Sequence, residues 1–223
     1  PRGGYLSPYK YPQLTSGPKG EYLTDRLTDE AVKFIEATKD KPFFLYLTHY
    51  AVHTPIQAKD ELIEKYKDRK PSHGQNNAKY AAMIESVDDS VGRVMAKLDE
   101  LKLTDDTVVL FTSDNGGFGG ATSMHPLRGI KGMLYEGGIR VPLCVKWPGR
   151  VDPGSKCDVP VIGVDLYPTF LEVTGAPQPR NVTLDGESIV PLLTQTGDLK
   201  RDAIYWHFPA YLQAGGAGGS GRF

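Results

Sequence analysis

Apolar residues recur every three or four positions in two stretches of the chain, which predicts two amphipathic helices. In residues 24–39 the apolar positions are Leu27, Ala31, Phe34 and Ile35, with acidic residues early and lysine late, as the helix dipole favours. Residues 77–101 repeat the pattern with Tyr80, Met83, Ile84, Val87, Val91, Val94, Met95, Leu98 and Leu101. A helix of about 25 residues would be roughly 37 Å long.

Short apolar runs, each too short for a helix, predict strands. These runs are FFLYLTH at 43–49, TVVLF at 107–111, RVPLCVKW at 140–147 and AIYWHF at 203–208. The first run is almost continuously apolar, so we expect it to be covered on both faces. Residues 163–175 predict a further helix that ends at Gly175. The first twenty residues and the glycine-rich stretch 210–223 predict loops.

The order of these elements predicts an α/β fold. A strand at 43–49, a long helix at 77–101 and a strand at 107–111 form a βαβ crossover, so the two strands should be parallel in one sheet with helices on its faces. Ligands of such sheets bind beyond the carboxyl ends of the strands. The loops at 51–55 and 113–117 both begin there, so we expect one site at that edge.

Composition and charge narrow the function classes. With 223 residues, the chain is long enough for one large domain, or one domain and a fragment. Its 26 basic and 27 acidic residues give a net charge of −1, so we expect no nucleic acid as a partner. No apolar run is long enough to predict a membrane span. The two cysteines, Cys144 and Cys157, stand in no metal-binding pattern and are expected to be ordinary residues.

Asp114 and Asn115, which lie just beyond the end of the strand predicted at 107–111, are candidate metal ligands. A carboxylate next to an amide oxygen supplies the hard oxygen ligands that suit Ca²⁺ or Mg²⁺. Two side chains do not fill a shell of six to eight oxygens, however. An Asx-turn followed by a flexible glycine turn is the alternative interpretation, and the pattern alone leaves both open.

Two cationic side chains are candidates for binding an anion. Lys131 lies among glycines in the segment 125–142, where its compact charge could neutralise the oxygens of a bound anion. His53, two residues before Pro55, could donate to an anion or protonate a leaving oxygen near neutral pH. For each, the alternative is a solvated loop residue. His49, at the end of a strand, is expected to be packed or hydrogen-bonded.

Taken together, several segments resemble the sulfatases of the alkaline-phosphatase superfamily. They are YAVHTPIQA at 50–58, AAMIESVDDSVGRVMAKLDEL at 81–101, TVVLFTSDNGG at 107–117, LRGIKGMLYEGGIRVPLCVKWPGRV at 127–151 and DLYPTFLEVTGAP at 165–177. The resemblance covers about Leu23 to His207 in family order. It implies a mostly parallel sheet flanked by helices, alkaline-phosphatase-like and incomplete in this chain.

The resemblance also implies a reaction and a set of roles. It implies hydrolysis of aryl or carbohydrate sulfate esters, with a formylglycine hydrate as nucleophile, made from Cys or Ser in a C/S-x-P-S/T-R motif. Asp114 and Asn115 would ligate a divalent cation, usually Ca²⁺, with Mg²⁺ as the alternative. Lys131 and His53 would contact the sulfate. A secreted or periplasmic location is the corresponding expectation, and the oligomeric state stays open.

The sequence departs from the family pattern at the nucleophile. Cys144 is followed by VKW and Cys157 by DVP, and no Ser-x-Pro-x-Arg occurs. We therefore expect the nucleophile and further metal-binding aspartates upstream of this chain, and no turnover by the chain alone. The expected organisation is an extended segment at 1–22, the later part of the catalytic domain at 23–200, and the start of a connection to a small C-terminal subdomain at 201–223.

Two rival functions remain open at this level. A phosphatase, phosphodiesterase or phosphonate hydrolase of the same superfamily would keep the fold, although such enzymes usually bind two zinc ions through several Asp and His ligands. A non-catalytic homologue that binds a sulfated glycan would keep the anion site without turnover. The single Asp-Asn pair favours one hard cation over two zinc ions.

Overall fold

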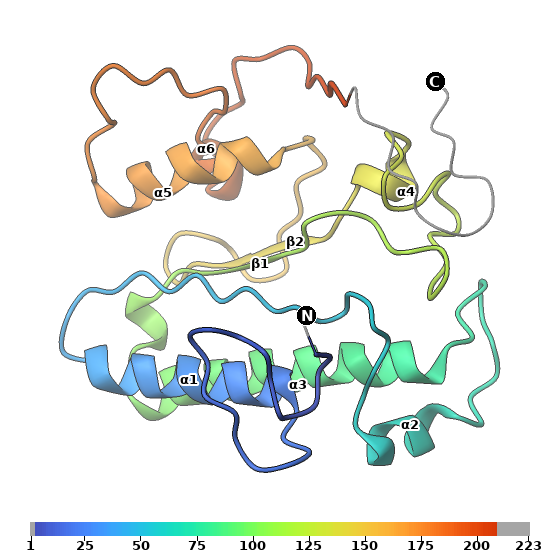
Figure 1. The fold of residues 1–223 in the computed structure, drawn as a ribbon. Coiled ribbons are helices and arrows are strands. Elements are labelled where there is room, and N and C mark those ends of the chain that lie inside the picture. Colours follow the sequence, from blue (N-terminus) through green and yellow to red (C-terminus); the bar gives the residue numbers. More distant parts are fainter. Residues whose placement is uncertain (1–2, 209–223) are drawn as a thin grey trace. The chain divides into compact units, whose positions relative to one another are not determined.

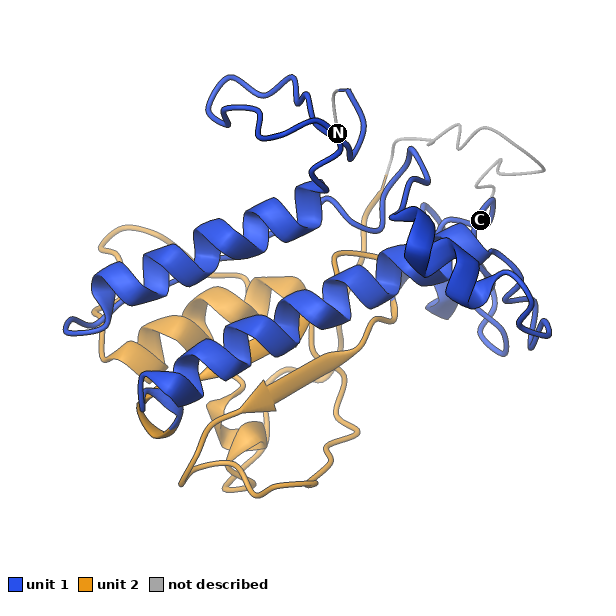
Figure 2. Ribbon diagram, turned by 90° about the horizontal axis from the view of Figure 1, so that it is seen from below, with its two compact units in different colours: residues 1–104, 116–139 blue, residues 105–115, 140–223 orange. Residues whose placement is uncertain are grey.

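A computed structural model describes residues 3–208 of the chain. It divides into two compact units, shown in different colours in Figure 2. Unit 1 comprises Pro1–Thr104 and Gly116–Ile139, and unit 2 comprises Asp105–Asn115 and Arg140–Phe223. Each unit therefore combines segments that are distant in the sequence.

Unit 1 is built on helices. Its elements are α1 (Leu23–Thr38), α2 (Asp60–Tyr66), α3 (Ala78–Glu100) and the short α4 (Glu136–Ile139). Helices α1 and α2 both pack against α3 (Figure 1). Helices α1 and α3 are the two amphipathic helices predicted from periodicity, and that prediction is confirmed. Asn77 caps α3, because its side-chain oxygen accepts a hydrogen bond from the backbone N–H of Tyr80 at 3.0 Å.

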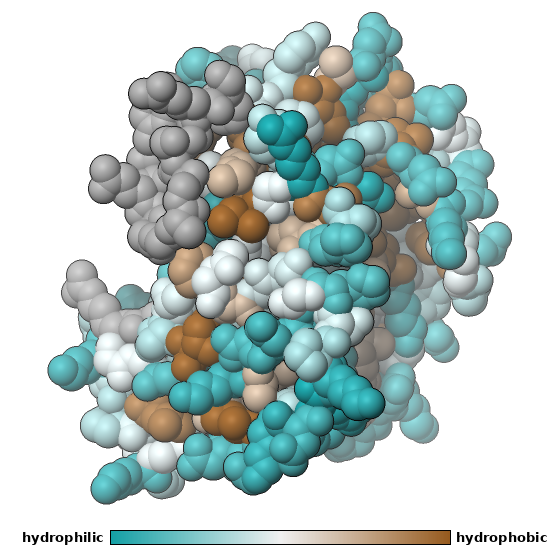
Figure 3. All heavy atoms as spheres, turned by 90° about the vertical axis from the view of Figure 1, so that its right-hand side faces the viewer, coloured by the Kyte–Doolittle hydropathy of each residue, from teal (hydrophilic) through white to brown (hydrophobic). Residues whose placement is uncertain are grey.

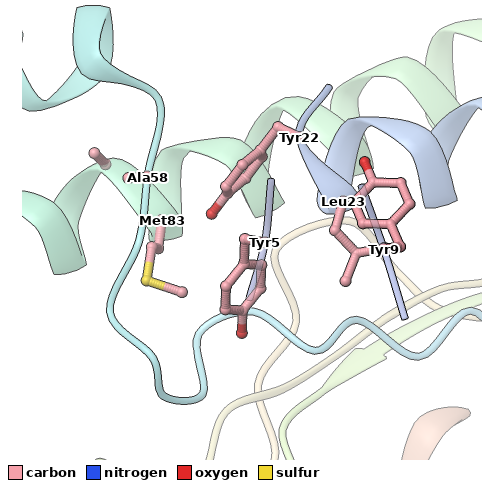
Figure 4. Packing of buried hydrophobic residues seen from close by; sticks show 7 residues of the cluster. Tyr5, Tyr9, Tyr22, Leu23, Ala58 and Met83 are labelled. Atoms are coloured by element: carbon pink, nitrogen blue, oxygen red, sulfur yellow. The ribbon is translucent and has the colours of Figure 1, made fainter. Parts of the chain in front are cut away.

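The hydrophobic core of unit 1 includes aromatic side chains from the N-terminal segment. Figure 4 shows this cluster, whose buried members are Tyr5, Tyr9, Tyr22, Leu23, Ala58, Ala82 and Met83. Residues 3–22 contain no helix and pair only through isolated bridges, such as Leu6 with Tyr22. The expected loop is thus present, but it is packed into the core because its tyrosines bury large apolar rings.

The run 43–49, predicted as a strand covered on both faces, is not a strand among the described residues. Its side chains alternate between half-buried and exposed, and Phe44 and Tyr46 are 62% and 79% exposed. The predicted parallel pairing with 107–111 is therefore not formed. An apolar run becomes a buried strand only where neighbouring strands supply hydrogen bonds and cover its faces, and none of the described residues does so.

Unit 2 contains the sheet of the described residues. Strands β1 (Val109–Thr112) and β2 (Leu143–Lys146) pair antiparallel, with Val109 opposite Lys146 and Thr112 opposite Leu143. Both strands were predicted from their apolar runs. The predicted strand at 203–208 is absent: these residues have no regular structure, and Tyr205 is 87% exposed. The glycine-rich stretch 210–223 lies outside the described residues.

The helices of unit 2 follow the sheet. Helix α5 (Leu166–Thr174) ends at Gly175, whose φ of 67° is the left-handed conformation of a helix C-cap, as predicted. The remaining short helices are α6 (Val190–Leu193) and two 3-10 helices, Thr104–Asp106, at the boundary between the units, and Gly163–Asp165. Cys144 and Cys157 are both free and exposed.

Exposed apolar side chains are common on this chain. The face drawn in Figure 3 shows them in brown among hydrophilic residues, and Phe44, Tyr46 and Tyr205 are examples from the structure as a whole. No helix among residues 3–208 combines the length and the apolar character that crossing a bilayer requires.

A buried ion pair holds the helical part of unit 2 together. The side chain of Asp165 is fully buried, and its two oxygens accept hydrogen bonds from the Arg201 guanidinium at 2.5 and 2.7 Å. The backbone N–H groups of Ile162 and Glu187 donate to the same carboxylate at 2.8 and 3.0 Å. Burial alone would raise the pKa of Asp165, but these four hydrogen bonds lower it below its ordinary value.

We predict that Asp165→Asn destabilises the chain by about 3 kcal/mol, because the amide replaces one carboxylate oxygen by a donor and leaves Arg201 without its counter-charge. Chemical denaturation followed by circular dichroism measures the effect. Asp185→Asn, at an exposed position of the same unit, is the matched control and should change little.

The same carboxylate makes the stability of unit 2 depend on pH. Because the folded-state pKa is lowered, the contribution is complete above the unfolded value of about 3.9 and is lost as the pH falls through the folded value. The difference in stability between wild type and Asp165→Asn should shrink over that range. An unchanged difference between pH 7 and pH 3 would contradict this assignment.

Candidate functional site

The four predicted site residues are divided between the two units. His53 and Lys131 belong to unit 1, whereas Asp114 and Asn115 belong to unit 2. Asn115 is followed directly by Gly116, the first residue of the second segment of unit 1. Within unit 1 the structure records no hydrogen bond between His53 and Lys131, which lie on different loops.

His53 presents its imidazole to solvent from the loop between residues 50 and 57. Its backbone N–H donates to the carbonyl of Tyr50 at 2.9 Å, which closes a tight turn. Its Nδ1 lies 3.1 Å from the carbonyl oxygen and 3.2 Å from the hydroxyl of Thr54. Because these local contacts engage only Nδ1, the Nε2 edge of the ring is available to a ligand.

Lys131 is half-buried in a loop that is fixed by backbone hydrogen bonds, most of which involve a glycine. Its own N–H donates to the carbonyl of Gly117 at 3.0 Å, and the N–H of Gly116 donates to Gly138 at 2.9 Å. Nothing in the described part of the chain forms a hydrogen bond or an ion pair with the Lys131 ammonium group. The nearby Arg128 instead places its guanidinium 3.9 Å from the centre of the Tyr135 ring.

Two backbone segments of this loop approach each other so closely that only glycine, which has no Cβ, fits at the contact positions. A Cβ on Gly116 would lie 1.9 Å from the carbonyl oxygen of Gly137, and one on Gly138 would lie 2.0 Å from that of Met133. The glycines that follow Asp114 and Asn115 thus do more than make a flexible turn. They allow the Lys131 loop to pack on the segment that begins one residue after Asn115.

Asp114 and Asn115 follow the end of β1 after one intervening residue, Ser113. The hydroxyl of Thr112, the last residue of β1, donates to the carbonyl of Pro142 at 3.0 Å and ties the strand end to the segment before β2. Asp114 is exposed and Asn115 is half-buried. Among residues 3–208 the Asp114 carboxylate forms no recorded hydrogen bond or ion pair, so its oxygens are available as ligands.

These two side chains fit part of a metal shell. Carboxylate and amide oxygens are the donors that Ca²⁺ and Mg²⁺ prefer. The described residues contain no group of three or more His, Cys, Asp or Glu side chains that could hold an ion by themselves. A Ca²⁺ ion held by Asp114 and Asn115 would therefore need oxygen ligands beyond those grouped in this structure.

Unit 1 contains two histidine arrangements, one expected from the sequence and one that sequence patterns missed. The Nε2 atom of His49 lies 3.0 Å from the hydroxyl of Ser90 in α3, and burial lowers the pKa of this imidazole. The expectation that His49 is hydrogen-bonded is thus confirmed. The rings of His73 and His125 stack with their centres 5.1 Å apart beside a pocket of about 450 Å³. No local signal pairs two histidines on separate loops.

Comparison with known proteins defines the class of this chain. A family model described as sulfatase matches residues 2–176. A sulfatase from Formosa agariphila is 41% identical over 210 residues, which cover 86% of this chain and 38% of the relative. Human steryl-sulfatase is 35% identical over 204 residues, which cover 86% of this chain and 33% of that enzyme. The chain belongs to the sulfatase family and spans about a third of the length of these relatives.

Solved structures confirm the fold class. The crystal structure of Ps i-CgsB in complex with k-i-k-neocarrahexaose is 38% identical, with a TM-score of 0.73, over 82% of this chain and 41% of that chain. Phosphonate monoester hydrolase SpPMH from Silicibacter pomeroyi has a TM-score of 0.61 at 22% identity, over 88% of this chain and 47% of that chain, which shows a common fold alone. The predicted alkaline-phosphatase-like α/β fold, incomplete in this chain, is therefore confirmed.

We predict that Gly138→Ala destabilises the chain by about 1–3 kcal/mol, because the added methyl group overlaps the carbonyl oxygens of Met133 and Ile130. The free energy of unfolding measures this effect. Gly92→Ala in α3 is the control, since nothing lies within 4 Å of its Cβ position. That variant should be up to about 1 kcal/mol more stable than wild type. Equal effects at both positions would contradict the close packing of the Lys131 loop.

Proposed function

We propose that this chain forms part of the catalytic domain of a sulfatase and supplies cationic and metal-binding groups to its site. Family membership supports a sulfuric ester hydrolase with metal-assisted chemistry. The observation that carries the assignment is the hydrogen bond from the Lys131 N–H to Gly117. It fixes the Lys131 loop to a residue two positions after Asn115 in the chain.

In this proposal the two cationic residues have different roles. Lys131 places a compact positive charge beside the sulfate oxygens and neutralises the negative charge that develops on them. His53 donates a hydrogen bond from its exposed ring, either to the sulfate or to the leaving oxygen, to which it can transfer a proton. Neither side chain needs to break an ion pair recorded in the structure before it binds the substrate.

Asp114 and Asn115 would hold the cation. When bound, a Ca²⁺ ion, with Mg²⁺ as the alternative, would polarise the sulfate oxygens as a Lewis acid. The Asp114 carboxylate and the Asn115 amide would supply two of the oxygens that hold such an ion. Their hard oxygens support a hard cation over zinc.

The nucleophile is proposed to come from residues other than these 223. Neither Cys144 nor Cys157 stands in a C/S-x-P-S/T-R motif, and both thiols lie at exposed positions. A formylglycine in a further segment would attack the sulfur of the bound ester. The chain alone is then expected to turn over no sulfate ester.

The substrate is proposed to be an aryl or carbohydrate sulfate. The relatives named above include a steryl-sulfatase and a protein solved with k-i-k-neocarrahexaose. A panel of 4-nitrophenyl sulfate, sulfated oligosaccharides and the corresponding phosphate esters, assayed with the full-length protein that carries this chain, tests the proposal. Turnover of phosphate esters in preference to all sulfate esters would overturn it.

Replacing Lys131 by methionine in the full-length protein should lower kcat/KM for sulfate esters by about 100-fold to 1,000-fold, because the positive charge that stabilises the transferred group is lost. Methionine keeps a similar side-chain length and removes only the charge. Lys79→Met, at an exposed position in α3, is the matched control and should retain wild-type kinetics. Wild-type kcat/KM in Lys131→Met would remove this residue from the site.

Replacing Asp114 by alanine should weaken calcium binding by at least about tenfold, since it removes a direct carboxylate ligand. Equilibrium dialysis with Ca²⁺ measures the binding, and kcat/KM should fall with it. Asp158→Ala removes an exposed carboxylate of the same unit and should alter neither quantity. Unchanged calcium affinity in Asp114→Ala would rule out the metal assignment, whatever the effect on turnover.

A further inference from the structure

We infer that Tyr5 is a positioning residue for His53, an inference that rests on the proposed role of His53 in binding the sulfate ester. The phenol oxygen of Tyr5 lies 2.6 Å from the carbonyl oxygen of Tyr50 and 2.8 Å from that of His53. The hydroxyl hydrogen is therefore shared between the two carbonyls at the turn that carries the His53 imidazole.

Tyr5 is well suited to hold this turn, because its own position is fixed on several sides. The residue is 0% exposed, and its ring stacks on that of Tyr22 with the ring centres 5.7 Å apart (Figure 4). Its backbone carbonyl accepts a hydrogen bond from the N–H of Leu23, at the start of α1, at 2.8 Å. Burial raises the pKa of the phenol well above its ordinary value, so the hydroxyl remains a donor.

The far end of the same loop is held by the same aromatic pair. The backbone N–H of Tyr5 donates to Oε1 of Gln57 at 2.8 Å, and the hydroxyl of Tyr22 donates to the backbone carbonyl of Gln57 at 2.8 Å. A Cβ on Gly4 would lie 2.3 Å from Gln57 Oε1, so the chain has a glycine where the loop approaches. The loop 50–57 is thus attached to the N-terminal segment at both of its ends.

This attachment matters because the His53 side chain has little else to fix it. The imidazole is exposed, and its recorded contacts are with the adjacent Thr54. The position of the ring therefore follows the position of the backbone at residues 50–53. A displacement of about 1 Å in a catalytic group can lower a rate by about 100-fold, so the placement of this backbone is expected to affect turnover.

Tyr5→Phe in the full-length protein tests the inference. Phenylalanine keeps the buried ring and the stacking on Tyr22 but removes the hydroxyl that holds the turn. We expect kcat for a sulfate ester such as 4-nitrophenyl sulfate to fall by about 10-fold to 100-fold, with KM changed less than about twofold.

Tyr9→Phe is the matched control. Tyr9 is buried in the same cluster and also donates its hydroxyl to a backbone carbonyl, that of Glu21, at 2.8 Å, but none of its recorded hydrogen bonds goes to the loop 50–57. Both variants should lose similar stability, whereas only Tyr5→Phe should lose kcat. Equal losses of kcat in the two variants would show that Tyr5 has only a general structural role and would overturn the inference.

A double-mutant cycle separates positioning from general damage. If Tyr5 acts through His53, then Tyr5→Phe should have no further effect on kcat in a His53→Ala background. The same fractional loss in both backgrounds would overturn the inference while leaving the role of His53 intact. Wild-type activity of His53→Ala alone would instead contradict the proposed function, and the positioning role would fall with it.

Gln57 provides a second test if Tyr5→Phe fails to fold. Gln57→Leu removes the acceptor of the Tyr5 N–H, whereas Gln57→Glu keeps an oxygen at that position. We expect kcat to fall in Gln57→Leu and to recover in Gln57→Glu, with KM again little changed. Wild-type kcat in Gln57→Leu, or an equal loss in both variants, would contradict the attachment of the loop through this contact.

Discussion

The structure of unit 1 depends on burying the aromatic rings of an irregular segment while satisfying the polar groups that are buried with them. Tyr5 and Tyr22 supply large apolar faces to the core, and each hydroxyl finds a backbone carbonyl of the loop 50–57. An unpaired buried hydroxyl or carbonyl would cost about 1–3 kcal/mol. The same contacts that remove this cost also fix the loop that carries His53.

A second constraint, close approach of backbones, shapes the Lys131 loop. Where the backbone at Gly138 passes the carbonyl of Met133, no side chain fits between the two segments. Hydrogen bonds between main-chain groups hold the loop at Gly117 and Gly138. Among the described residues, no ion pair with the Lys131 ammonium group is recorded. In unit 2 the corresponding restraint is electrostatic, because the fully buried Asp165 is balanced by Arg201.

Both long helices of unit 1 were predictable from the sequence, because periodic apolar positions select a helix wherever one face can be buried. The strand before Asp114 and the helix ended by Gly175 were predictable for similar local reasons. The runs 43–49 and 203–208 were predicted as strands and are not strands here. Such a run forms a strand only when other strands pair with it, and the sequence of the run does not determine whether they do.

The sequence by itself determined the family, the two amphipathic helices, and the residue types that can bind a sulfate ester and a hard cation. These follow from local periodicity and from motifs that lie within short segments. Only the tertiary structure decided that the hydroxyl of an N-terminal tyrosine holds the turn of His53. It also decided that the two glycines after Asn115 form hydrogen bonds with the backbone of the Lys131 loop. Such contacts join residues about 15 to 50 positions apart, and their formation depends on packing and on the satisfaction of buried polar groups, which no local pattern encodes.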